Sequence, residues 1–225
     1  AVLKNLIQGA LQKTKSKPNF LSCFHSFIHN TINGERINPR TKKAIGSAVA
    51  KGYQTTYNHL VNFNKKWNRE LNFDTIDLDF HLQFTRYLSS TPLRLSANTI
   101  GSHFQRIKAV LAEATEKGIN SNMIFKSKYF IKQVENADTT YLTKQELSEI
   151  IDLKLDGNER LANVRDLFLI GCFTGLRFSD FSILQPKNIS EGFIRITQIK
   201  TGTPVIIPIH PVVAEILRKY NGGLP

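Results

Sequence analysis

Residues 96–118, SANTIGSHFQRIKAVLAEATEKG, constrain the fold more than any other stretch, because their apolar side chains recur at the spacing of one helix face. Ser96 can cap the start of this helix, and Gly118 stands where a helix C-terminus favours a left-handed residue. The stretch therefore predicts an amphipathic helix with one buried face, which consists of Ile100, Phe104, Ile107, Leu111 and Ala114.

Similar apolar spacing predicts three earlier helices, at 20–30, 47–67 and 77–89. Between the long helix and residue 141 the composition becomes polar and mixed, which predicts a linker at 126–140. The front of the chain is therefore expected to be a set of amphipathic helices.

The chain after residue 140 combines helices with a β-hairpin. Thr143 followed by Glu146 is the signature of a helix start. An apolar helix is predicted at 159–174, a hairpin of alternating side chains at 192–209 and a short helix at 210–220. The apolar side chains assigned to the first of these are Leu161, Val164, Leu167, Phe168 and Cys172. The predicted fold class is mainly α with a small β-hairpin or sheet.

Charge is distributed unevenly along the chain. Residues 1–139 carry a net charge of +11, and residues 140–225 carry +1 of the total of +12. A basic front favours contact with a polyanion such as nucleic acid, although a merely soluble basic surface is the alternative. The sequence contains no run of about 18 apolar residues, so it predicts no membrane span. Cys23 and Cys172 fit no metal spacing and are expected to be reduced core residues of an intracellular protein.

The stretch FTGLRFSD places a single arginine, Arg177, between two helices. Gly175 is expected to end the first helix, and Ser179 to cap the second with Asp180 in its first turn. Unpartnered backbone N–H groups at a helix start bind anions, and a guanidinium adds a bidentate fork for phosphate. The junction therefore predicts a phosphate cradle. The alternative is a structural arginine paired with Asp166 or Asp180.

Lys200 stands at the turn of the predicted hairpin, and Thr99, Ser102, His103 and Arg106 share one face of the 96–118 helix. Hydroxyls, a histidine and an arginine suit a surface that reaches phosphates and base edges. By themselves, these residues are more typical of a solvent-exposed turn and an ordinary solvated helix face.

Three of these stretches resemble the tyrosine recombinase (integrase) family. TGLRFSDFSIL resembles the family's arginine box, and ITQIKTGTPVIIPI resembles its hairpin with the catalytic lysine. The helix at 96–118 resembles the last long helix of the core-binding domain. The resemblance covers about 18–225 and is closest to integrases of bacterial mobile elements.

The resemblance implies a domain organisation. A tethering segment at 1–14 precedes a helical, SAM-like four-helix core-binding domain at 15–125. The linker at 126–140 then leads to the N-terminal part of an α+β catalytic domain at 141–225.

The resemblance also implies a reaction. A tyrosine attacks a DNA phosphodiester to give a 3′-phosphotyrosine, and a 5′-hydroxyl reverses this on another strand, without a metal or a cofactor. The family's first catalytic arginine falls on Arg177 and its lysine, which protonates the leaving oxygen, on Lys200. Asp180 takes a supporting role. Full-length members act as homotetramers on DNA in the bacterial cytoplasm, associated with the nucleoid.

The sequence departs from the family after Lys200, because no His-x-x-Arg motif follows and Tyr220 does not resemble the nucleophile. We expect the chain to stop within the catalytic domain, to be monomeric, and to bind duplex DNA without cleaving it. In the family the two domains close on DNA as a clamp, with helices 47–67 and 96–118 toward the major groove. The candidate DNA contacts are Lys51, Thr55, His59, Asn98, Thr99, Ser102, His103, Arg106 and Lys108.

Two other functions share some of these features. A non-catalytic DNA-binding regulator with an integrase-like skeleton would have the same basic helices. An RNA-binding helical protein is less consistent, because nothing resembles a recognition sheet with exposed aromatic residues. A P-loop enzyme is excluded, since no Gly-Lys-Ser/Thr follows the glycines of GCFTGLR.

Overall fold

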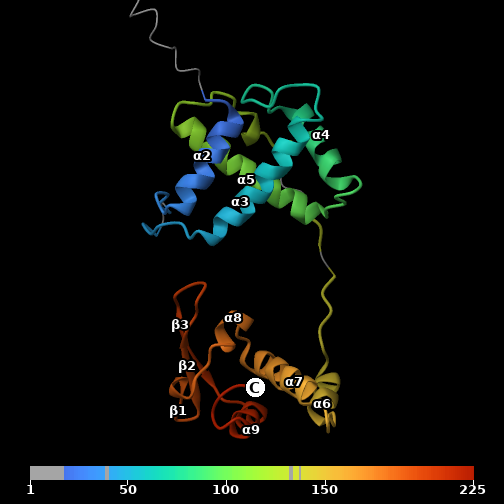
Figure 1. Cartoon of the computed structure of the whole chain (residues 1–225), viewed down its shortest axis with the longest axis vertical. Coiled ribbons are helices and arrows are strands. Elements are labelled where there is room, and N and C mark those ends of the chain that lie inside the picture. Colours follow the sequence, from blue (N-terminus) through green and yellow to red (C-terminus); the bar gives the residue numbers. More distant parts are fainter. Residues whose placement is uncertain (1–17, 39–40, 132–133, 137) are drawn as a thin grey trace, which may run out of the picture. The chain divides into compact units, whose positions relative to one another are not determined.

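The computed structural model describes residues 18–38, 41–131, 134–136 and 138–225 and divides the chain into two units (Figure 1). The first unit ends at Ala137 and the second runs from Asp138 to Pro225. The predicted tethering segment at 1–14 lies outside the described residues.

The first unit is helical, and a helix begins within each of the four predicted stretches. Two of these helices start at side-chain caps, because the side-chain oxygens of Asn19 and Asp77 accept backbone N–H groups of the first turn. The elements are α2 (Phe20–Ile32), α3 (Ala48–Asn64), α4 (Leu78–Ser89), α5 (Ala97–Glu116) and the 3₁₀ turn η1 (Ile124–Lys126).

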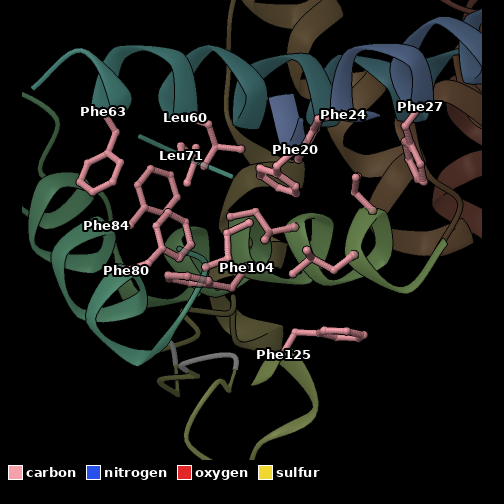
Figure 2. Close-up of a cluster of buried hydrophobic side chains, with 14 of the residues drawn as sticks. Phe20, Phe24, Phe27, Leu60, Phe63, Leu71, Phe80, Phe84, Phe104 and Phe125 are labelled. Carbon is pink, nitrogen blue, oxygen red and sulfur yellow. The ribbon is translucent and has the colours of Figure 1, made fainter. Parts of the chain in front are cut away.

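A phenylalanine-rich core holds the first unit together. Figure 2 shows Phe63 of α3 beside Phe80 and Phe84 at one end of this core, with Phe24 and Phe27 of α2 toward the other end. The rings of Phe63 and Phe84 meet edge to face, with their centroids 5.2 Å apart. The predicted apolar face of α5 is confirmed, because all five of its residues are buried: Ile100, Phe104, Ile107, Leu111 and Ala114.

The ends of α5 confirm one expectation and correct another. Gly118 follows the helix with a φ of +69°, a left-handed conformation that glycine adopts without a steric penalty. Ser96 occupies the position before the helix, but its side chain caps no backbone N–H. Its hydroxyl instead pairs with the Thr99 hydroxyl at 3.0 Å.

The predicted linker at 126–140 is not a simple connection. The boundary between the units falls inside it, but Phe130 is fully buried in the core of the first unit. Its ring meets the ring of Phe104 edge to face, and its carbonyl accepts a hydrogen bond from the Lys108 ammonium. The helical unit therefore continues past η1, because a polar-looking segment carries one large apolar side chain into the core.

The second unit packs its helices against a small antiparallel sheet. The predicted hairpin is confirmed, with Phe193 opposite Pro208 and Thr197 opposite Pro204, and a short third strand that the sequence did not predict joins its edge. The fold class, mainly helical with a small sheet, is therefore confirmed. The elements are α6 (Lys144–Asp152), α7 (Glu159–Thr174), α8 (Phe178–Phe181), η2 (Pro186–Asn188), β1 (Ile189–Ser190), β2 (Phe193–Thr197), β3 (Pro204–Pro208) and α9 (Pro211–Lys219).

In this unit the sequence predicted the start of a helix correctly, but it predicted the buried face of a helix poorly. The Thr143–Glu146 capping box forms at the start of α6. On α7 the core residues are instead Leu169 and Ile170. The expected apolar face is wrong for Leu161, Val164, Phe168 and Cys172, which are exposed, while Leu167 packs against the core. Cys23 is half-buried, so neither cysteine is the fully buried core residue expected, although both are free thiols.

Candidate functional site

The junction of α7 and α8 leaves Arg177 exposed. Gly175 ends α7 in a left-handed conformation with a φ of +63°. Arg177 is the residue before α8, and its carbonyl accepts the backbone N–H groups of Asp180 and Phe181. Its side chain is 46 % exposed and therefore available to a ligand.

One expectation about this junction is wrong. Ser179 does not cap α8, because the helix begins one residue before it and Arg177 occupies the cap position. α8 also contains only four residues, too few to build the dipole and the row of free N–H groups of an anion-binding helix start. Any grip on phosphate at this junction therefore depends on the guanidinium of Arg177.

Asp180 connects this junction to the hairpin. Its carboxylate is fully buried, and Oδ1 accepts a hydrogen bond from the backbone N–H of Ile199 at 2.9 Å. Oδ2 lies 3.7 Å from Nη1 of Arg177, an ion-pair contact without a hydrogen bond. Asp180 thus holds the residue next to Lys200 and also attracts the guanidinium of Arg177.

The hairpin turn that carries Lys200 is closed by its own hydrogen bonds. The N–H of Gly202 donates to the carbonyl of Gln198, and the hydroxyl of Thr201 donates to the Gln198 side chain. Gly202 adopts a φ of +67°, which this turn requires. Lys200 itself is exposed at the tip of the turn. The structure therefore presents Arg177 and Lys200 as exposed cations on two segments that Asp180 links.

Asp166, the other expected partner for Arg177, belongs to a different cluster. It is buried, forms ion pairs with Arg165 and Lys219, and accepts a hydrogen bond from the Tyr220 hydroxyl at 2.9 Å. Although burial opposes ionisation, these partners lower the pKa of Asp166 overall. The hydroxyl of Tyr220 also contacts Asn163 at 2.9 Å. Tyr220 therefore anchors α9 on α7.

In the helical unit, most of the candidate DNA contacts surround one cavity between α3 and α5. Its volume is about 420 Å³. None of the described residues that line it is acidic, and Arg106 is its single Lys or Arg. The lining residues are Gly52, Thr55, Asn98, Thr99, Ser102, His103 and Arg106.

His103 is buried at the back of this cavity, so it is not the surface contact that the sequence suggested. Its Nδ1 hydrogen-bonds the hydroxyl of Thr56 at 2.8 Å, and its ring meets the ring of His59 edge to face. Burial, with smaller contributions from His59 and Arg106, lowers the pKa of His103 to about 4. Burial also lowers the pKa of His59. His103 is therefore a neutral support for the cavity wall at pH 7.

Other candidate contacts have partners within the unit. The Asn98 amide exchanges two hydrogen bonds with the backbone of Glu135. The Lys108 ammonium donates to Phe130, and the hydroxyl of Thr55 donates to the carbonyl of Lys51. Lys51, His59 and Lys108 do not line the cavity. Gly52 does line it, although no pattern in the sequence singled out that residue.

Neither a metal cluster nor a membrane span is found in the part of the chain that the structure describes. No group of three or more His, Cys, Asp or Glu side chains there could hold a metal ion. No described helix is both long and apolar enough to cross a bilayer.

The helical unit matches a known domain family. Residues 24–133 match the model of the phage integrase SAM-like domain. This range includes most of α2, all of α3, α4, α5 and η1, and the segment that contains Phe130. Among curated proteins, none matches the chain by sequence.

The fold of the chain is similar to the folds of solved integrases. A lambda integrase tetramer bound to a Holliday junction matches with a TM-score of 0.65 and 15 % identity over 97 % of this chain and 64 % of that one. The Tn1549 transposon integrase in complex with a circular intermediate DNA matches with a TM-score of 0.66 and 15 % identity, over 89 % and 64 %. The chain thus spans about 64 % of the length of these integrases.

Proposed function

We propose that the chain is of the tyrosine recombinase type and works in site-specific DNA recombination, because residues 24–133 match a phage integrase SAM-like domain and the fold is similar to that of solved integrases. In this proposal the helical unit binds duplex DNA, and the second unit presents Arg177 and Lys200 to one phosphodiester. The observation that carries it is the link through Asp180, which ties the arginine junction to the lysine hairpin.

The helical unit suits DNA because of its charge and its surface. Nearly all of the net positive charge lies in residues 1–139. Its polar cavity contains hydroxyls, an amide and a guanidinium, the groups that contact phosphates and sugars. Affinity from such contacts arises largely from counterion release, and it therefore falls steeply with salt.

The second unit suits a developing phosphate charge because it exposes two cations, Arg177 and Lys200, on segments that Asp180 connects. Arg177 offers a planar fork, which matches two phosphate oxygens, and Lys200 offers a point charge with protons to donate. Because Asp180 is buried and is held by Ile199, it orients this region without itself facing the ligand. The proposed roles are charge stabilisation by Arg177 and protonation of the leaving 5′-oxygen by Lys200.

We further propose that these 225 residues bind DNA without cutting it. No His-x-x-Arg motif follows Lys200 in the printed sequence, and the Tyr220 hydroxyl is occupied by Asn163 and Asp166. These same two observations also favour a second candidate, a DNA-binding regulator with an integrase skeleton. A polypeptide that continues into a His-x-x-Arg motif and a nucleophilic tyrosine would be the recombinase, and one without them would be the regulator.

Equilibrium binding tests the DNA-binding proposal directly. Fluorescence anisotropy of a labelled DNA duplex, and of the same sequence as RNA, is followed from low to physiological salt. We expect tighter binding to DNA and a logarithmic salt slope of several units, because each phosphate contact contributes about 0.9. A shallow slope, or equal affinity for duplex RNA, would contradict the proposal.

A further inference from the structure

We propose that Gly52 is a positioning residue for Arg106, and that the seated guanidinium is the phosphate-binding group of the cavity between α3 and α5. Gly52 lies within α3, and Arg106 reaches it from α5. This inference rests on the proposed DNA binding of the helical unit. It assigns a ligand, one backbone phosphate of duplex DNA, to that cavity.

The contact between these two residues leaves no room for a side chain at position 52. A Cβ at Gly52 would lie 2.8 Å from Nε of Arg106, 2.9 Å from its Nη2 and 3.0 Å from its Cζ. The guanidinium therefore lies against the bare α3 backbone. Gly52 is in an ordinary helical conformation, which any residue can adopt. Glycine is needed at this position because there is no room for a Cβ, and not because of the backbone conformation.

Among the described residues, none forms a hydrogen bond or an ion pair with the end of the Arg106 side chain. Its charge lowers the pKa of His103 after the larger effect of burial, and it opposes the rise in the pKa of Tyr53 that burial causes. These effects place the guanidinium near both rings. A cation held by packing alone keeps its N–H groups free for a ligand.

The other polar groups of the cavity offer few free donors. The hydroxyls of Thr55 and Ser102 donate to backbone carbonyls of their own helices. The Asn98 amide donates to Glu135, and the Thr99 hydroxyl pairs with Ser96. Arg106 is therefore the main source of N–H donors, and its fork fits two oxygens of a phosphate.

Substitution of Gly52 by alanine separates this role from helix stability. Because the obstructed atoms are at the end of a flexible side chain, Arg106 can swing away while α3 stays folded. Alanine is also the better helix former, so G52A should unfold at the same temperature as wild type or at a higher one. The fluorescence of Trp67, the single tryptophan of the chain and a residue packed on this core, reports that unfolding.

The experiment measures duplex DNA affinity for wild type, G52A, R106A and the double variant. R106A should weaken binding about tenfold and reduce the salt slope by about 1. G52A should reproduce most of both effects, and the double variant should match R106A. The matched control is G46A, because a Cβ at Gly46 meets nothing within 4 Å. G46A should bind as wild type does.

Each contrary result has a defined meaning. If R106A weakens binding but G52A does not, Gly52 does not position Arg106 and the inference is overturned, while the proposed function stands. A double variant weaker than R106A would show that the added methyl group obstructs DNA itself, which also overturns it. A lower unfolding temperature for G52A would assign Gly52 to helix packing. No duplex binding by the wild type would reject the proposed function and this inference together.

Discussion

The buried carboxylate of Asp180 accepts the backbone N–H of Ile199 across 2.9 Å, and this contact joins α8 to the turn of the β2–β3 hairpin. The two residues are 19 positions apart, and Lys200 is the next residue after Ile199. The same carboxylate has its second oxygen 3.7 Å from Arg177. One side chain therefore contacts both Arg177 and the residue that precedes Lys200.

Removal of this carboxylate should destabilise the second unit alone. D180A leaves the N–H of Ile199 without its partner, so we expect a loss of about 1–3 kcal/mol in the free energy of unfolding. D180N keeps an oxygen for Ile199 and should lose less. Urea unfolding followed by far-UV circular dichroism measures this, while Trp67 fluorescence reports the helical unit. An equal shift of the Trp67 transition would contradict the assignment.

The buried His103 should make the helical unit sensitive to acid. Its pKa is about 4 in the folded chain against an ordinary value of 6.5, so the unfolded state binds the proton first. Stability should therefore fall as the pH drops from about 6.5 to 4, by on the order of 2–3 kcal/mol. The unfolding free energy, measured from Trp67 fluorescence across this range, tests the effect.

The matched variant for this test is H103N. Asparagine can still hydrogen-bond the hydroxyl of Thr56 but does not titrate. The variant should be less stable at pH 7, yet its stability should change less between pH 6.5 and pH 4. An unchanged pH dependence in H103N would show that His59, or another group, is responsible.

Phe130 should contribute to the stability of the helical unit as a core residue does. Truncation of a buried phenylalanine to alanine costs about 3–5 kcal/mol, and Phe130 is fully buried against Phe104. The control is its neighbour Tyr129, which is 65 % exposed, so Y129A should change stability by less than about 0.5 kcal/mol. Trp67 fluorescence in urea compares the two variants. Equal effects would place residues 126–131 in a linker after all.

Tyr220 should prove structural. Y220F removes the hydroxyl that contacts Asn163 and Asp166, and we expect a loss of about 1–2 kcal/mol from the second unit with no effect on DNA affinity. A nicked duplex loses the short strand with the 5′-hydroxyl after cleavage, so a covalent protein–DNA intermediate cannot reverse and accumulates. A denaturing gel detects this adduct. The wild-type chain should give no adduct. An adduct that Y220F abolishes would identify Tyr220 as a nucleophile.

The sequence predicted elements whose signals are local. The apolar face of α5 was evident because its period is regular, and the Thr143–Glu146 capping box needs only four residues. The face of α7 was not evident, because apolar residues occur all around this helix and only packing shows that Leu169 and Ile170 are inside. Phe130 was missed for a similar reason, because it stands between Tyr129 and Ile131 in an otherwise polar segment, and only packing shows which of these side chains is inside.

The residues of the candidate site also fall into two groups, those that a local motif predicts and those that depend on tertiary contacts. Arg177 and Lys200 could be selected from short motifs, whereas the contact between Asp180 and Ile199 depends on how the hairpin folds back. Ser179 was placed wrongly because the sequence does not show that Arg177 takes the cap position. His103 and Gly52 depend on the crossing of α3 and α5, which brings residues far apart in the sequence together. No pattern within a single helix predicts such a contact.

The central claim is that Arg177 and Lys200 grip the same phosphodiester, and a double-mutant cycle in duplex DNA affinity tests it most directly. R177A, K200A and the double variant are compared with wild type at one fixed salt concentration, with K187A as a control for a cation elsewhere in the second unit. We expect each single variant to weaken binding and the double variant to lose clearly less affinity than the product of the two single losses, because groups on one phosphate are coupled. If the double variant loses the full product of the two single losses of affinity, the two residues act independently and do not share a phosphodiester. Single variants that bind DNA as tightly as K187A does would also contradict the claim.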